Sequence, residues 1–177
     1  MRKKSDGEKQ VIVFIDAANI IYGCRRVGWK MDFEKLIRYM KTRLKADRIL
    51  YYAGLDSENK KQLLFYEALQ RFGYELRLVP VKRFKDGLRK GDVDARLTFE
   101  AMKYLNEYDE GIFLTGDGDY YWLLEYLLQN GKKTRLIAHR ESTAKELRQL
   151  FGGTFTDISR LKKLLEFRKK TKKRQTP

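Results

Sequence analysis

The stretch Val11-Ile12-Val13-Phe14-Ile15-Asp16-Ala17-Ala18-Asn19 decides the fold of this chain. Its first five residues are all apolar, which is typical of a strand that is buried on both faces at the centre of a parallel sheet. Asp16 ends the apolar run, so a carboxylate stands where the strand is expected to end. Because open α/β sheets bind their ligands at the carboxyl edge, the stretch indicates both an α/β fold and the place of a site.

The rest of the chain alternates strand and helix patterns around this central strand. Pro80 lacks the N–H that a strand ladder needs, which places its strand at or near an edge of the sheet. The alternation favours right-handed crossovers, so we expect a three-layer α/β/α sandwich with a five-stranded parallel sheet. Residues 155–158 are expected to form only a short extended segment, and a last helix begins near Leu161. The other predicted strands cover residues 48–53, 76–81, 111–114 and 134–138, and the predicted helices cover 33–44, 58–72 (capped by Ser57), 92–106, 118–129 and 142–151.

Positive charge is concentrated at one end of the chain. The 177 residues carry a formal net charge of +15, of which residues 160–177 contribute +8 and residues 11–159 only +5. We therefore expect a flexible basic N-terminus at 1–10, one domain at 11–160, and a C-terminal helix with a basic tail at 161–177. Such a tail either contacts nucleic-acid phosphates or only keeps the protein in solution, and both interpretations stay open.

Several classes of protein are excluded by composition. No run of about 18 apolar residues is present, and no signal peptide follows the N-terminus, so we expect a cytoplasmic protein without a membrane partner. The single Cys24 excludes an internal disulfide and a cysteine-based zinc site. The single His139 argues against a histidine-centred catalytic triad. For so basic a domain, nucleic acid is the usual partner.

Other phosphate-handling α/β proteins fit this sequence less well. The chain has no Gly-x-x-x-x-Gly-Lys-Ser/Thr loop of an NTPase, and no glycine triad of a nicotinamide enzyme follows the first strand. Ala18 stands where a haloacid-dehalogenase phosphatase has its second Asp. Val81 and Lys82 stand where a receiver domain has its phosphoacceptor Asp.

Acidic and polar side chains follow two of the predicted strands. Asp16 and Asn19 follow the first strand, and Thr115, Asp117 and Asp119 follow the fourth. If these strands are neighbours, their carboxylates repel one another, and a divalent cation would remove that penalty. Mg²⁺ or Mn²⁺ would also activate a water and stabilise charge on a phosphodiester. A lone Asp after a strand is more often a helix cap, but several such side chains at one edge favour a metal site.

A further group of acids opens the helix predicted at 92–106. Asp92 suits an N-cap, and Asp94 can reach the site from the first turn of the helix. Glu100 lies six residues after Asp94, about 120° around an ideal helix, so both cannot point squarely at one ion. We prefer Asp94 as a ligand and leave open whether Glu100 lies at the margin of the site or on a solvated face.

Three blocks of the sequence together resemble the NYN domain, a branch of the PIN-like nuclease superfamily, in its bacterial LabA-like form. Phe14–Asn19 resembles the opening strand with Asp and, three residues later, Asn. Lys90–Glu100 resembles the block with Val-Asp after Lys-Gly, and Thr115–Tyr120 resembles Ser/Thr-Gly-Asp-x-Asp followed by an aromatic residue. The resemblance covers roughly residues 11–160. The middle block departs from the family pattern in two ways: Glu100 replaces the usual Asp, and Asp92 is an additional acid.

The resemblance implies strand order 3-2-1-4-5 and a ribonuclease that depends on Mg²⁺ or Mn²⁺. The alternative keeps the fold without the chemistry, as a catalytically silent RNA-binding regulatory protein. The mode of cleavage, the RNA preference and the formation of a homodimer stay open. The resemblance assigns metal binding and catalysis to Asp16, Asp94, Asp117 and Asp119, and the orientation of ligands, water or phosphate to Asn19 and Thr115. Glu100 is kept as a further supporting candidate.

Basic side chains in two predicted loops, one after Asn19 and one at 82–90, are expected beside the acidic edge, where they would hold RNA phosphates. The aromatic residues Tyr22, Trp29 and Phe84 lie among them and either stack on unpaired bases or anchor the loops in the core. Tyr120-Tyr121-Trp122 is expected in the core, and His139 as a solvated polar cap. The basic candidates for RNA binding are Arg25, Arg26, Lys82, Arg83, Lys85, Arg89 and Lys90, with Lys30 nearby.

Overall fold

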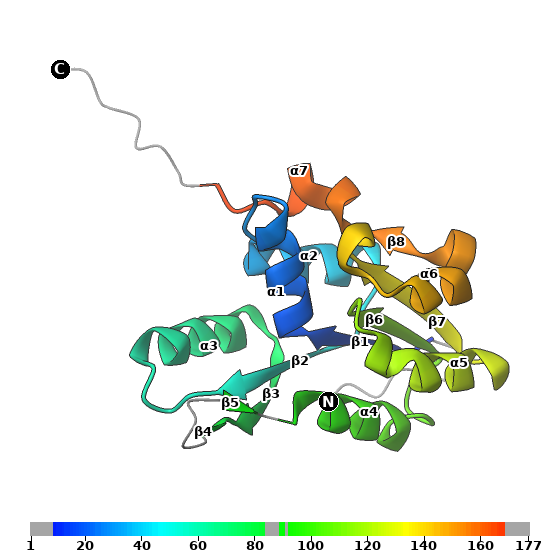
Figure 1. Ribbon diagram of the computed structural model, residues 1–177, viewed down its shortest axis with the longest axis horizontal. Helices are drawn as coiled ribbons and strands as arrows, with labels where there is room; N and C mark the ends of the chain where they lie inside the picture. The colour runs from blue at the N-terminus through cyan, green and yellow to red at the C-terminus, as the bar shows by residue number, and fades with distance from the viewer. Residues whose placement is uncertain (1–8, 84–88, 91, 169–177) are drawn as a thin grey trace.

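A six-stranded parallel sheet forms the middle layer of the protein (Figure 1). The computed structural model describes residues 9–83, 89–90 and 92–168. The order in the sheet is β3-β2-β1-β6-β7-β8, which is 3-2-1-4-5-6 when the strands of this sheet are numbered along the chain. The strands are β1 (Val11–Asp16), β2 (Arg48–Leu55), β3 (Glu75–Pro80), β6 (Glu110–Leu114), β7 (Lys133–Ala138) and β8 (Thr156–Asp157).

The expected α/β/α sandwich with a parallel sheet is confirmed, but the count of five strands is wrong. Thr156 pairs with Ile137 and Asp157 with Ala138, so the segment expected only to be extended adds a sixth strand beyond β7. This strand is two residues long, and so short a segment has no periodic pattern from which a strand could be predicted. At the opposite edge lies β3, which contains Pro80, in agreement with the edge position predicted from its missing N–H.

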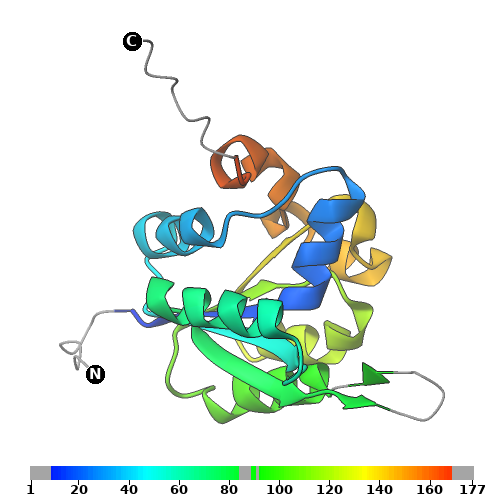
Figure 2. The same cartoon turned by 90° about the vertical axis from the view of Figure 1, so that its left-hand side faces the viewer.

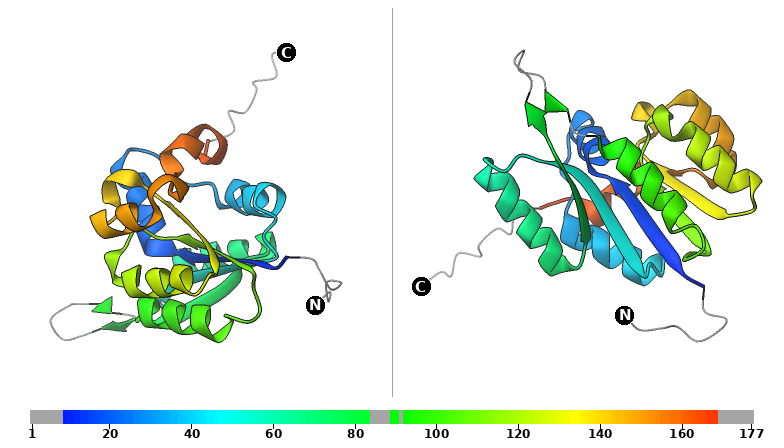
Figure 3. Two further views of the ribbon diagram at one scale, coloured as in Figure 1. Left: turned by 90° about the vertical axis from the view of Figure 1, so that its right-hand side faces the viewer. Right: turned by 90° about the horizontal axis from the view of Figure 1, so that it is seen from below.

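Helices cover both faces of the sheet (Figure 3). The buried apolar side chains form two clusters, one between the sheet and α1, α2 and α3, the other between the sheet and α4, α5 and α6. Val13 and Ile15 belong to the first cluster, and Ile12 and Phe14 to the second, which explains the unbroken apolar run of β1. The helices are α1 (Ala17–Arg26), α2 (Phe33–Arg43), α3 (Lys60–Phe72), α4 (Val93–Lys103), α5 (Tyr121–Gln129), α6 (Lys145–Phe151) and α7 (Lys162–Leu165).

Shorter elements complete the chain. An antiparallel pair, β4 (Lys82–Arg83) and β5 (Arg89–Lys90), extends away from the main sheet (Figure 2). Within the described ranges, none of the helices combines the length and the apolar character that crossing a membrane requires. The 3₁₀ helices are η1 (Gly118–Tyr120), η2 (Arg140–Ser142), η3 (Gly152–Thr154) and η4 (Ile158–Leu161).

Two helix starts differ from the sequence-based expectation. The segment after Asn19, expected as a loop, belongs to helix α1, which the Asp16 carboxylate caps by accepting a hydrogen bond from the Asn19 N–H at 3.2 Å. Asn59, not Ser57, caps α3, and it accepts from the Gln62 N–H at 3.1 Å. The end of α3 is as predicted, since Gly73 has φ +101° in the left-handed region that favours glycine.

Candidate functional site

Parallel pairing of β1 with β6 brings Asp16 next to the start of the Thr115–Tyr120 block. Ile15 pairs with Leu114, so Asp16 and Thr115 leave neighbouring strands at the same edge. Thr115 donates a hydrogen bond from its hydroxyl to Asp16 Oδ2 at 3.2 Å. The predicted approach of the two strand ends is therefore present in the structure.

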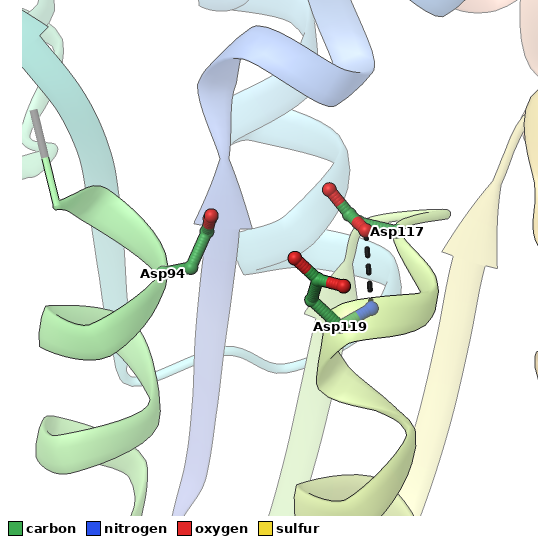
Figure 4. A group of neighbouring side chains, drawn as sticks. All are labelled: Asp94, Asp117 and Asp119. Atoms are coloured by element: carbon green, nitrogen blue, oxygen red, sulfur yellow. Dashed lines mark hydrogen bonds between the residues drawn. The ribbon is translucent and has the colours of Figure 1, made fainter. Parts of the chain in front are cut away.

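Three carboxylates converge at this edge (Figure 4). Asp94 in the first turn of α4, Asp117 before η1 and Asp119 within η1 each offer an oxygen, and these oxygens all lie within 4.8 Å of one another. Asp117 also accepts a hydrogen bond from the Asp119 N–H at 3.1 Å, so it caps η1 as well. A set of carboxylate oxygens this close fits a hard divalent cation, which prefers oxygen ligands.

Asp16 ends β1 at the same sheet edge and is only 4% exposed. The pKa of its carboxyl is raised to about 6, chiefly by burial and in smaller part by the negative charges of Asp94 and Asp117, against the hydrogen bonds from the Asn19 N–H and Thr115, which lower the pKa. The charges of Asp94 and Asp117 thus act on Asp16, although Asp16 is not one of the three acids whose oxygens lie within 4.8 Å of one another.

Asn19 and Thr115 orient the carboxylates and the backbone of the site. Asn19 Oδ1 accepts a hydrogen bond from the Gly116 N–H at 2.7 Å, which ties the first turn of α1 to the end of β6. Thr115 Oγ1 also accepts from the Asp117 N–H at 3.1 Å. Gly116 has no room for a side chain, because a Cβ there would lie 2.8 Å from Thr143 Oγ1. Loop and strand ends are therefore fixed tightly around the acids.

Tyr120 is a site residue that sequence reasoning placed only in the core. It is fully buried, as expected, but its hydroxyl donates a hydrogen bond to Asp94 Oδ1 at 2.6 Å. Burial raises the pKa of the phenol far above its ordinary value, so the hydroxyl keeps its proton and its role as donor. The aromatic residue directly after Asp119 in the Thr115–Tyr120 block was the feature of the sequence that could have indicated this role.

Glu100 is not brought to the acidic group. It is buried on another side of α4, where it accepts from Tyr52 Oη at 3.0 Å, Arg77 Nε at 2.7 Å and Arg96 Nε at 3.0 Å. Burial by itself would raise the pKa of Glu100, but these hydrogen bonds outweigh it and lower the pKa. Asp92 occupies the N-cap position of α4 without a side-chain capping bond.

The aromatic residues and the histidine take varied positions. Trp29 is buried, in agreement with an anchor in the core, whereas Tyr22 is 67% exposed. Trp122 was expected in the core but is 76% exposed, because α5 buries its neighbouring leucines instead. His139 was expected to be solvated, yet it is buried, and neither ring nitrogen has a hydrogen-bond partner among the described residues. Phe84 lies outside the described residues.

A cavity of about 960 Å³ opens beside the acids, and Asp16, Asp94 and Asp117 line it. Arg25 and Arg26, in the last turn of α1, line the same cavity, together with Lys30. The other basic candidates lie in or near the β4–β5 hairpin. Lys85 lies outside the described residues, and only the backbone is described for Lys82, Arg83, Arg89 and Lys90.

Comparison with known proteins agrees with this architecture. The family model of the NYN domain matches residues 10–159. The chain belongs to the NYN domain family. It is 24% identical over 165 residues to the low amplitude and bright protein LabA of Synechococcus elongatus, a match that covers 89% of this chain and 88% of that protein. This similarity places our NYN domain protein in the LabA-like branch.

A solved structure shares the fold of this NYN domain protein. The crystal structure of a protein of unknown function from Vibrio parahaemolyticus RIMD 2210633 superposes with a TM-score of 0.74 and 27% sequence identity. The match covers 88% of this chain and 96% of that chain. The PIN-like α/β fold is thus present over nearly the whole length.

Proposed function

We propose that this protein is a ribonuclease that depends on Mg²⁺ or Mn²⁺ and hydrolyses RNA phosphodiesters at the acidic edge of its sheet. The observation that carries the proposal is the convergence of Asp94, Asp117 and Asp119, whose carboxylate oxygens lie within 4.8 Å of one another. Membership of the NYN domain family supports the same chemistry. We place this activity in the cytoplasm.

The three converging carboxylates and Asp16 would hold the cation. When bound, a divalent cation at this place polarises the phosphodiester and lowers the pKa of a water nucleophile. The donor set fits, since Mg²⁺ and Mn²⁺ prefer oxygen ligands such as carboxylates. Metal affinity is expected to rise with pH near 6, because the carboxyl of Asp16 loses its proton only when the pH exceeds its raised pKa.

Hydrogen bonds from the surrounding residues orient these acids. Tyr120 donates to Asp94 from beneath and fixes the direction of its carboxylate. Thr115 donates to Asp16 and accepts from the Asp117 backbone, so one hydroxyl orients two of the acids. Asn19 holds the Gly116 backbone against α1. Such hydrogen bonds to ligating groups reduce the reorganisation that binding and catalysis would otherwise require.

Basic residues next to the acids supply the attraction for RNA. Arg25, Arg26 and Lys30 line the same cavity as the acids. Their positive charges would bind phosphates on either side of the bond to be cut, while the acids themselves repel RNA unless a cation is present. This arrangement makes RNA binding depend on both salt and divalent metal.

The test is cleavage of one structured and one unstructured RNA with Mn²⁺. Wild type should cleave, and Asp117→Asn should reduce the rate by roughly 100-fold or more, because one of the converging charges is removed. Asp109→Asn is the matched control, since Asp109 is exposed and binds the Gln10 N–H away from the site. Equal cleavage by wild type and Asp117→Asn would contradict the proposal. Binding without cleavage by either would support the RNA-binding regulator instead.

A further inference from the structure

The cavity extends well beyond the acidic group. Its volume of about 960 Å³ is near the upper end of the range of about 300 to 1,000 Å³ that is typical of ligand pockets. Asp94 and Asp117 line one part of it, and another part is lined by the N-cap and the first turns of α3, through Asn59, Gln62 and Phe65. A metal site alone needs none of these α3 residues.

Aromatic side chains from two helices line this cavity. Tyr22 of α1 is 67% exposed, and its packing into the protein is slight. Phe65 of α3 is held from behind by Phe33, with ring centroids 5.4 Å apart, and by Tyr66 at 5.9 Å. Stacking on such rings is the usual way in which proteins hold unpaired bases, because every base has a π-face.

The polar side chains at the start of α3 are already oriented by the helix cap. Asn59 Oδ1 accepts from the Gln62 N–H at 3.1 Å, and Gln62 Oε1 accepts from the Asp56 N–H at 2.8 Å. With both amide oxygens engaged, the NH₂ group of each side chain is the end left to donate. Donors of this kind match the carbonyl oxygens on the edges of nucleobases.

Cations line the same cavity between the acids and α3. Arg25, Arg26 and Lys30 form no ion pair with any carboxylate among the described residues. Their charges are therefore available to an anionic ligand. A ligand that offers both phosphates and unpaired bases fits a cavity with cationic and aromatic walls, and a single nucleic-acid strand is such a ligand.

We propose that the part of the cavity between α1 and α3 is a nucleobase subsite, with Tyr22 and Phe65 as its stacking surfaces and Gln62 and Asn59 as hydrogen-bond donors. It takes an unpaired base that flanks the phosphodiester at the acids, and in this respect it rests on the proposed function. A base that is paired in a helix cannot place its face against either ring, so the subsite selects single-stranded RNA over duplex RNA.

Binding of RNA in the Asp117→Asn background tests the subsite, since the strand then stays intact. Fluorescence polarisation would follow a labelled 12-nucleotide single strand and the same strand annealed to its complement. Tyr22→Ala should weaken single-strand binding by roughly 5- to 100-fold, the range expected for the loss of one stacked base. Tyr126→Ala is the matched control, because Tyr126 is an exposed tyrosine of α5 that does not line the cavity.

A second variant tests the subsite with a substitution that should leave the protein folded. Phe65→Leu keeps an apolar side chain against Phe33 and removes the flat ring, so it should weaken single-strand binding while the unfolding temperature changes little. Duplex binding should be weaker than single-strand binding and unaffected by Tyr22→Ala. Unchanged single-strand affinity in Tyr22→Ala and in Phe65→Leu would overturn the subsite.

The subsite and the nuclease can fail separately. If wild type does not cleave but Tyr22→Ala weakens single-strand binding, the subsite stands and the nuclease proposal falls. If wild type cleaves while Tyr22→Ala and Phe65→Leu bind and cleave like wild type, the nuclease stands and the subsite falls.

Discussion

Asp16 has a structural role in the fold and, under the proposed function, a chemical role as well. One carboxylate oxygen caps α1 by accepting from the Asn19 N–H, and the other accepts from the Thr115 hydroxyl. Burial raises its pKa to about 6, so the metal-free protein carries a carboxylate that is costly to ionise. The sequence places Asp16 at a strand end, but only the pairing of β1 with β6 explains why it is buried among other acids.

The cost of ionising Asp16 predicts a pH-dependent effect of Asp16→Asn. Because the pKa is higher in the folded state than the roughly 3.9 of an unfolded chain, the contribution of Asp16 to the stability of the fold falls as pH rises from about 4 through 6. Asn stays uncharged, so without metal the variant should be more stable than wild type at pH 8 by about 1–3 kcal/mol. Thermal unfolding in EDTA measures this. A difference between the two proteins that is the same at pH 4 and pH 8 would contradict it, and Mn²⁺ should stabilise wild type more than the variant.

Tyr120 gives a second prediction at the residue scale. Tyr120→Phe keeps the buried ring and removes only the hydrogen bond to Asp94. Loss of a bond that orients a ligating group should reduce Mn²⁺ affinity and cleavage by about 10- to 100-fold. Calorimetric titration with Mn²⁺ would measure the affinity. Tyr121→Phe is the control, because its hydroxyl donates to Glu125 outside the site; equal effects of the two substitutions would rule out a special role for Tyr120.

At the scale of elements, α4 is positioned by charge as well as by apolar packing. Glu100 on this helix accepts from Arg77 of β3, and Arg96 donates to the Leu78 carbonyl oxygen of the same strand at 2.7 Å. Because Asp94 lies in the first turn of α4, these contacts also set where its carboxylate stands. Glu100 therefore acts on the site through the position of the helix.

Glu100→Gln should accordingly destabilise the fold without removing a metal ligand. Arg77 would lose one of its two charged partners and keep only Glu75, in a place where its side chain is largely buried, which costs about 1–3 kcal/mol. Urea unfolding measures this loss, with Glu107→Gln as the control, since Glu107 pairs with Arg48 at the surface. We expect Mn²⁺ affinity to fall far less in Glu100→Gln than in Asp94→Asn. A loss of affinity as large as that of Asp94→Asn would make Glu100 a ligand after all.

For the whole molecule, the architecture was predictable and several contacts were not. Unbroken apolar runs predict the central strands, because a strand buried on both faces needs apolar residues at every position. Asp16 and Asp117 follow the ends of two such runs, so their place at the sheet edge could also be predicted. The strand at 156–157 was too short for a pattern. Arg77, one of the three partners of Glu100, lies 23 residues earlier in the chain, and spacing along one helix carries no information about it. The cavity wall formed by α3 likewise depends on how separate elements pack.

The uneven charge of the molecule predicts an effect of its C-terminal end. Most of the +8 charge of residues 160–177 belongs to residues 168–177, of which all but Arg168 lie outside the described residues. Replacing the six Lys and Arg residues of 168–177 by Gln should weaken RNA binding and reduce its salt dependence, by about 0.7 in the logarithmic slope for each single-strand phosphate that these side chains neutralise. Affinity measured from 50 to 300 mM KCl would test this. An unchanged slope would show that this segment does not bind RNA.

The proposed function requires that the acids of the sheet edge hold a divalent cation. A crystal soaked in Mn²⁺ and measured for anomalous scattering tests it most directly. We predict an anomalous peak within coordination distance of carboxylate oxygens of Asp94, Asp117 and Asp119, and its disappearance in Asp117→Asn. No peak at this edge, at Mn²⁺ concentrations that support cleavage or RNA binding, would contradict the claim.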